Sequence, residues 1–200
     1  MMIPQIQAAA NTRVKKRAAG ERNPVTMKKQ SSFRLGVLAA LFAALIFVVT
    51  AYVLHIPTPA TGGYIHLGDA FVYLAASILP APYAIAAAGI GEALSDLLTG
   101  GAAFALPTLV IKSAMALCFT AAGEKIVTKR NAAASVFAGL ICIGGYYLTE
   151  VFLLHSFSAP VVEIPANAVQ AAASAVIYLL AGRALDRTKV KNSVSAFVRS

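Results

Sequence analysis

Six ionisable side chains lie inside or at the edges of long apolar runs, where a charge is expensive to bury. They are Asp69, Glu92, Asp96, Lys112, Glu150 and Glu163. Glu92 and Asp96 are four residues apart, so two like charges would face the same side of a helix and repel. Either Lys112 neutralises this pair or one carboxyl group is protonated. Ionisable groups within a membrane are usually paired or line a cavity, so the pattern predicts a polar pocket.

Further polar residues recur around these charges at helical spacing. One stripe, at i, i+4, i+7 and i+11, consists of Glu163, Asn167, Gln170 and Ser174. A second face carries Cys142, Tyr146, Thr149 and Glu150, and Thr108 lies four residues before Lys112. Such stripes either line a pocket or join helices by hydrogen bonds. We expect ligand contacts from Lys112, Glu150, Glu163 and Asn167, and helix packing from Ser174, Thr149 and Cys142. Asp69 and Asp96 fit a pocket or a helix cap equally well.

The composition places these residues in an integral membrane protein. Of the 200 residues, 58% are hydrophobic and only 12% are charged, and the mean hydropathy is +0.73. Six apolar runs predict an all-α bundle of six transmembrane helices within a membrane domain at 33–183. The predicted helices span residues 33–54, 67–79, 83–98, 105–122, 132–155 and 161–181.

Both flanks of this domain are basic. We predict a disordered cytoplasmic tail at 1–32 and a second basic cytoplasmic tail at 184–200. An alternative is that Met27 is the true start and that residues 1–26 are an extension of the gene model.

The distribution of basic residues sets the predicted orientation. Of the 17 lysine and arginine residues, only Lys112 lies in the interior of a predicted helix, since Arg34 is at the very edge of the first one. The others fall in the two tails and in the break after the fourth helix, all on one side of a six-helix topology. The positive-inside rule makes that side cytoplasmic. A re-entrant segment at 67–79 would invert the later helices. The net charge of +9 therefore reflects membrane topology and gives no indication of nucleic-acid binding.

In this topology all six ionisable residues fall in the outer half of the membrane, which predicts a pocket open to the outside. The loop at 55–66 contains two prolines and two glycines and would lie at the mouth of the pocket. We predict that it acts as a lid, with His66 and Asp69 at the lip.

The first predicted helix carries a stripe of small residues. Gly36, Ala40 and Ala44 are spaced by four, and Ala39 and Ala43 form a parallel row. Such spacing lets another helix approach closely, within this chain or from another protein.

The sequence lacks motifs for nucleotide binding and for catalysis. The sequence has no G-x-x-x-x-G-K-[ST] nucleotide loop, no H-E-x-x-H metal motif and no G-x-S-x-G nucleophile motif. We therefore expect no cofactor, no metal and no enzyme activity, and a binding subunit that is energised from elsewhere.

Three segments resemble the substrate-binding S components of energy-coupling factor (ECF) vitamin transporters. They are residues 56–69 (IPTPATGGYIHLGD), 91–96 and 107–112 (PTLVIK). The start of the last helix at 163–170 (EIPANAVQ) also looks like the branch that takes riboflavin, pyridoxine and hydroxymethylpyrimidine. The similarity spans about residues 33–183. Glu92 departs from the pattern, in which a small residue is expected.

This resemblance implies a binding subunit of the prokaryotic cytoplasmic membrane. It would capture a small vitamin-like substrate from outside and dock on a transmembrane T component, which two ATP-binding subunits drive. Docking would use Gly36, Ala39, Ala40, Ala43 and Ala44. The expected substrate-binding residues are His66, Asp69, Asp96, Thr108, Lys112, Tyr146, Glu150, Glu163, Asn167 and Gln170.

Aromatic residues and both signs of charge near the predicted pocket favour a zwitterion or a hydrogen-bonding heterocycle. Tyr146, Tyr147 and Phe152 accompany the polar groups, and the chain has no tryptophan. We favour a pyridoxine-like or pyrimidine-like compound over riboflavin. Two alternatives remain: a membrane enzyme that uses Glu92, Asp96, Glu150 and Lys112 as acid–base groups, or a scaffold protein that only holds partners together.

Overall fold

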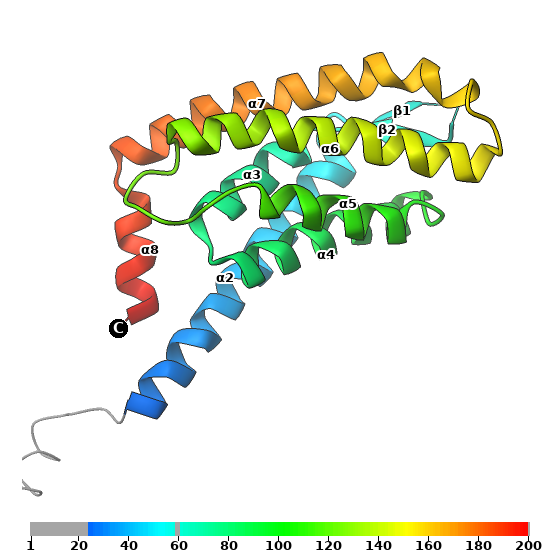
Figure 1. Ribbon diagram of the computed structural model, residues 1–200. Helices are drawn as coiled ribbons and strands as arrows, with labels where there is room; N and C mark the ends of the chain where they lie inside the picture. The colour runs from blue at the N-terminus through cyan, green and yellow to red at the C-terminus, as the bar shows by residue number, and fades with distance from the viewer. Residues whose placement is uncertain (1–23, 59–60, 200) are drawn as a thin grey trace, which may run out of the picture.

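The computed structural model describes residues 24–58 and 61–199, which form a bundle of helices with one small hairpin (Figure 1). In chain order the elements are α2 (Pro24–Tyr52), β1 (Ile56–Thr58), β2 (Gly63–Ile65), α3 (Gly68–Ile78), α4 (Ala81–Thr99), α5 (Ala105–Leu117), α6 (Lys129–Leu154), the 3-10 turn η1 (Ala159–Glu163), α7 (Ile164–Arg187) and α8 (Val190–Arg199). Each of the six predicted helices therefore has a counterpart.

Within the described residues, three segments are long and apolar enough to cross a membrane, namely residues 30–52 of α2, α6, and η1 with α7. The helices α3 and α5 are apolar but shorter. With 11 residues, α3 is about 16 Å long, whereas the hydrocarbon core of a bilayer is roughly 30 Å thick. The chain is thus a multi-pass helical membrane protein, and six complete spans remain a prediction.

The first helix begins earlier than its apolar run. Residues 24–32, predicted as part of a disordered tail, are helical, and Pro24 occupies the first position, where proline is well tolerated. No proline or glycine lies between Pro24 and Gly36, so nothing interrupts the helix before the apolar segment. Residues 1–23 lie outside the described part, as does most of the proposed 1–26 extension.

Helix α3 is the centre of the bundle. It packs against α2, α4, α5 and α7, while α2–α4, α4–α5, α5–α6 and α6–α7 are neighbouring pairs around it. All its residues except Phe71 are buried. Because α3 is so short, its N-terminal residues Gly68 and Asp69 lie inside the molecule instead of at a membrane surface.

The hairpin and α8 lie at opposite ends of the bundle (Figure 1). The antiparallel strands β1 and β2 pair Ile56 with Ile65 and Thr58 with Gly63, near the turn between α6 and α7. At the other end, α8 runs across the end of α7. The Arg34 side chain of α2 donates to the Phe197 carbonyl of α8 at 2.9 Å and lies 5.4 Å from the Phe197 ring centroid. The predicted basic tail at 184–200 is therefore largely helical.

Candidate functional site

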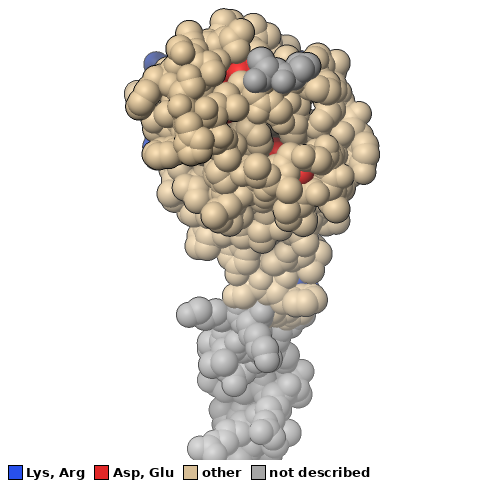
Figure 2. Space-filling model, turned by 90° about the vertical axis from the view of Figure 1, so that its right-hand side faces the viewer, with Lys and Arg blue, Asp and Glu red and all other residues tan. Residues whose placement is uncertain are grey.

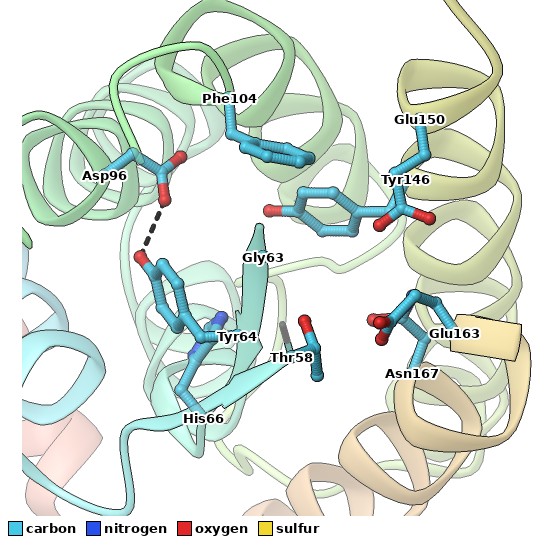
Figure 3. Close-up of a pocket in the computed structure, with 10 residues that line it drawn as sticks. All are labelled: Thr58, Gly63, Tyr64, His66, Asp96, Phe104, Tyr146, Glu150, Glu163 and Asn167. Atoms are coloured by element: carbon cyan, nitrogen blue, oxygen red, sulfur yellow. Dashed lines mark hydrogen bonds between the residues drawn. The ribbon is translucent and has the colours of Figure 1, made fainter. Parts of the chain in front are cut away.

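A polar cavity lies at the hairpin end of the bundle (Figure 3). It encloses about 370 Å³ of atom-free space, part of which is open to solvent. The lining residues come from the hairpin and its flank, α4, the turn before α5, α6, η1 and α7. They are Thr58, Gly63, Tyr64, His66, Asp96, Phe104, Tyr146, Glu150, Glu163 and Asn167.

The hairpin forms one wall of this cavity and holds it nearly closed. The free space inside it that water can occupy is only about 20 Å³, on the order of one or two waters. A ring-sized ligand therefore requires an outward movement of the wall. The hairpin is the smallest lining element, and its two strands have only three residues each.

Tyr64 fastens the hairpin to α4. Its hydroxyl group donates to Asp96 Oδ1 at 2.6 Å and lies 3.1 Å from Ser95 Oγ. Its ring stacks on His55 with centroids 3.9 Å apart. Burial and the nearby Asp96 charge raise the pKa of Tyr64 well above its usual value, so the hydroxyl keeps its proton and acts as a donor.

A fully buried ion pair lies deeper in the bundle. Lys112 Nζ of α5 donates to Asp69 Oδ1 of α3, and both side chains are inaccessible to solvent. The other carboxylate oxygen, Oδ2, accepts from Gln170 Nε2 of α7 at 2.9 Å. Cys142 Sγ of α6 lies 3.7 Å from Oδ2 and 3.9 Å from Lys112 Nζ. This pair joins four helices through the central α3.

His66 connects this ion pair to the cavity. Its backbone N–H donates to Gln170 Oε1 at 3.0 Å, and its Nδ1 accepts from the Gly68 N–H at 3.1 Å. Because Nδ1 accepts, the neutral ring carries its proton on Nε2, which lies 3.6 Å from Glu92 Oε2. Burial, together with the Lys112 charge, lowers the pKa of His66 to about 3, so the ring is neutral at physiological pH.

Gly68 permits the close approach of these groups. A Cβ atom there would lie 1.8 Å from Thr50 Oγ1 of α2, 2.6 Å from Glu92 Oε1 and 3.0 Å from His66 Nδ1. The absence of a side chain thus lets α2, α4 and the start of α3 meet at one point.

Ligand atoms of His66, Asp69 and Glu92 lie within 4.8 Å of one another, a spacing that a metal ion could bridge. Lys112 already supplies the positive charge next to Asp69. The three residues therefore form a polar layer beneath the cavity, in which Glu92 Oε2 lies 3.6 Å from His66 Nε2, and we assign no metal to them.

The structure brings the predicted site residues together in two layers. His66, Asp96, Tyr146, Glu150, Glu163 and Asn167 line the cavity. The remaining four lie outside the lining: Asp69, Lys112 and Gln170 form the layer beneath it, and Thr108 shares a 3.0 Å hydrogen bond with the Tyr146 hydroxyl group.

Several other expectations are resolved by these positions. All six ionisable residues in the apolar runs are buried, as predicted. Lys112 pairs with Asp69 and not with the carboxylates of α4. Phe152 is 76% exposed and Tyr147 donates to the Phe157 carbonyl, so neither accompanies the polar groups.

Four lining residues were not anticipated: Thr58, Gly63, Tyr64 and Phe104. Three of them belong to the loop that was expected to cover the pocket. Phe104 directly precedes α5 and could have been suggested by its place before that apolar run.

The face at the cavity end is mostly uncharged. Figure 2 views it from this side and shows small Asp and Glu areas on the face and small Lys and Arg areas at the margin. The basic residues of α8 and of the loop before α6 lie toward the other end.

Apolar helices around a polar cavity define a helical membrane protein with a candidate binding site for a small solute. The sequence profile of ECF-type riboflavin transporter S components matches residues 30–187, and the chain belongs to this family. A relative from Pyrococcus woesei, described as an uncharacterized protein in gap 3′region, is 29% identical over 130 residues. This match covers 64% of the chain and 86% of the relative.

Proposed function

We propose that the chain is the substrate-binding subunit of an ECF-type importer. It captures a small vitamin-like heterocycle, pyridoxine-like or pyrimidine-like, and releases it inward when docked on a transmembrane T component with two ATPases. The observation that carries this proposal is the polar cavity behind the hairpin, with a buried ion pair beneath it, in a bundle of apolar helices. Family membership supports the same role.

The arrangement of charge supports an outward-facing cavity. The hairpin and the cavity lie at the end opposite α8 and the loop that contains Lys125. By the positive-inside rule, the end with the basic residues is cytoplasmic, so the hairpin end faces outward in the prokaryotic cytoplasmic membrane. The hairpin lies at the outer end and comes directly before α3 in the chain. Although α3 is short, the chain therefore runs from the outer end back toward the cytoplasmic end through the hairpin and α3.

An apolar groove between α2 and α4 supports the docking role. Its walls are Gly36, Ala39, Ala40, Ala43, Ala44 and Phe47 of α2 and Tyr83, Ala86, Ala87, Ile90 and Leu94 of α4. All five predicted docking residues thus line one groove. Ala40 and Ala44 are exposed, whereas Ala39 is buried and Ala43 packs beside Gly91, so the Ala40/Ala44 row is the accessible one.

Mass spectrometry of the denatured protein tests the binding role. The chain is purified in mild detergent from cells grown on a vitamin mixture, and small molecules released on denaturation are identified. We expect one heterocycle at near-stoichiometric amounts. Asn167→Ala removes a lining amide and should weaken binding about tenfold, the equivalent of one hydrogen bond. Asn192→Ala, on exposed α8, is the matched control. If no compound is released from the unsubstituted chain, the binding role is wrong.

Substitution in the groove tests docking separately. Ala40→Leu fills the groove and should abolish uptake and co-purification with the T component while ligand binding persists. Ala172→Leu, at an exposed alanine on α7, is the control and should leave both unchanged. Normal uptake by Ala40→Leu would exclude this row as the docking surface.

A further inference from the structure

The cavity has an uneven charge. Three of its described lining residues are acids, namely Asp96, Glu150 and Glu163, and none is lysine or arginine. His66 is the one lining side chain that could become a cation, and it is neutral at physiological pH for the reasons given above. A ligand in this cavity therefore meets three carboxyl groups and no lysine or arginine among the described lining residues.

The nearest lysine does not compensate for these acids. Lys112 is fully buried and is engaged by Asp69 beneath the cavity. Its ammonium group also lies 5.2 Å from the Tyr146 ring centroid, so the ring stands close to this charge. Lys112 therefore does not offer a free cation to a ligand. A zwitterion, which the presence of both charge signs had suggested, would find no positive partner for its anionic group.

Two of the acids present acceptor atoms that nothing in the described chain satisfies. Asp96 Oδ2 and Glu150 Oε2 are buried and have no hydrogen-bond partner among the described residues. Both side chains are only 4% exposed. A buried acceptor without a partner has lost its water and gained nothing in return, which destabilises the empty cavity. A ligand that brings N–H donors removes this cost, whereas a ligand that brings only acceptors does not.

Aromatic rings complete the cavity. Phe104 and Tyr146 lie with ring centroids 6.5 Å apart, and Tyr64 stands opposite Phe104 in the close-up (Figure 3). Aromatic faces favour a flat ring and also attract a positive charge.

We infer that the cavity selects a small aromatic heterocycle that carries a positive charge or a protonated amino group, in preference to neutral or anionic rings. This inference rests on the proposed function. The donor groups of the ligand would be held between Asp96 on α4 and Glu150 on α6. Glu163 faces the same space from η1 and adds to the attraction.

Matched pairs of probes test this preference. The chain, reconstituted in lipid nanodiscs after removal of any co-purified compound, is titrated at pH 7 by calorimetry. Pyridoxamine is compared with pyridoxine, and 5-(aminomethyl)pyrimidine with 5-(hydroxymethyl)pyrimidine, since an aminomethyl group is protonated at pH 7 and a hydroxymethyl group is neutral. Within each pair the ring is similar and the amino group distinguishes the two compounds. We expect the amino compound of the preferred pair to bind at least tenfold more tightly.

Neutral isosteres of the acids test the cause. Glu150→Gln and Glu163→Gln should each reduce the preference within a pair at least threefold, because each weakens binding of the amino compound more than binding of the neutral one. Glu124→Gln, at an exposed position near the opposite end, is the control. Two variants are used so that a folding defect in one, detected by gel filtration, leaves the other informative.

The outcomes separate the inference from the proposed function. Equal or tighter binding of the neutral compounds, or a neutral or anionic compound released from the purified chain, overturns the charge preference and leaves the binding role intact. An unchanged preference in both variants also overturns it. If no probe binds and no heterocycle is released on denaturation, the proposed function itself fails.

Discussion

Replacing Lys112 by methionine should be among the most damaging single substitutions in the bundle. Met is close to the lysine stem in volume, so the change removes the charge and little of the packing. Asp69 would then be a buried carboxylate that retains only Gln170 and the weak contact with Cys142.

The expected magnitude follows from this geometry. Removing one partner of a buried ion pair costs about 3–5 kcal/mol, because the other charge remains without compensation. Replacing Asp69 by asparagine as well removes the uncompensated charge. The double variant should then lose only about 1–2 kcal/mol, equivalent to one or two hydrogen bonds. The second substitution therefore rescues the first, and the two effects are far from additive.

Reversible unfolding in mixed micelles, followed by circular dichroism as sodium dodecyl sulfate is added, measures these free energies. Lys125→Met, at an exposed position in the loop before α6, is the matched control and should change stability by less than about 0.5 kcal/mol. A loss below about 1 kcal/mol for Lys112→Met, or a double variant as unstable as the sum of its parts, would refute the view that this pair holds α3 in place.

Three further predictions concern the hairpin and the layer beneath it. Gly68→Ala places a methyl group 1.8 Å from Thr50 Oγ1 and should cost about 1–3 kcal/mol in the same unfolding assay, whereas Gly36→Ala, with nothing within 4 Å, should be neutral or stabilising. Equal effects of the two glycine substitutions would contradict the close approach.

The folded state holds His66 neutral with a pKa of about 3, against 6.5 in the unfolded chain. Between these two pH values the unfolded state therefore binds a proton that the folded state does not. The contribution of His66 to the free energy of unfolding should therefore be fully present above pH 6.5 and fall by up to about 1.4 kcal/mol per pH unit below it. His66→Gln should lack this fall, and an unchanged pH dependence would argue against a buried neutral ring. Tyr64→Phe removes the hydroxyl group that fastens the hairpin to α4 and should raise the ligand dissociation rate several-fold in stopped-flow measurements; an unaltered rate would mean that this bond does not hold the hairpin closed.

The helices and their buried faces could be predicted because hydropathy and helical spacing are local properties. The stripe of Glu163, Asn167, Gln170 and Ser174 is buried along its whole length. The burial of the six ionisable residues followed from the same reasoning. Spacing shows which residues share a face of one helix, and that is enough to indicate a polar interior.

Pairing between helices could not be predicted in the same way. Lys112 could have faced the carboxylates of α4 or Asp69 of α3, and only the packing of α3 at the centre decides for Asp69. The hairpin was expected only as a loop, since two strands of three residues leave almost no alternation to detect. Tyr64 therefore emerged as a lining residue from the fold alone.

The contact between α2 and α8 gives the C-terminus a connection to the groove. Arg34 lies on the same helix as Ala40 and Ala44, and it holds the carbonyl group and the ring of Phe197 in the last turn of α8. Any rotation of α2 during docking must carry α8 with it or break this contact. The exposed Ser195 is therefore a suitable attachment point for a fluorescent reporter of the proposed docking. A bulky purification tag fused directly behind α8 would act through this contact on α2, the helix proposed to dock.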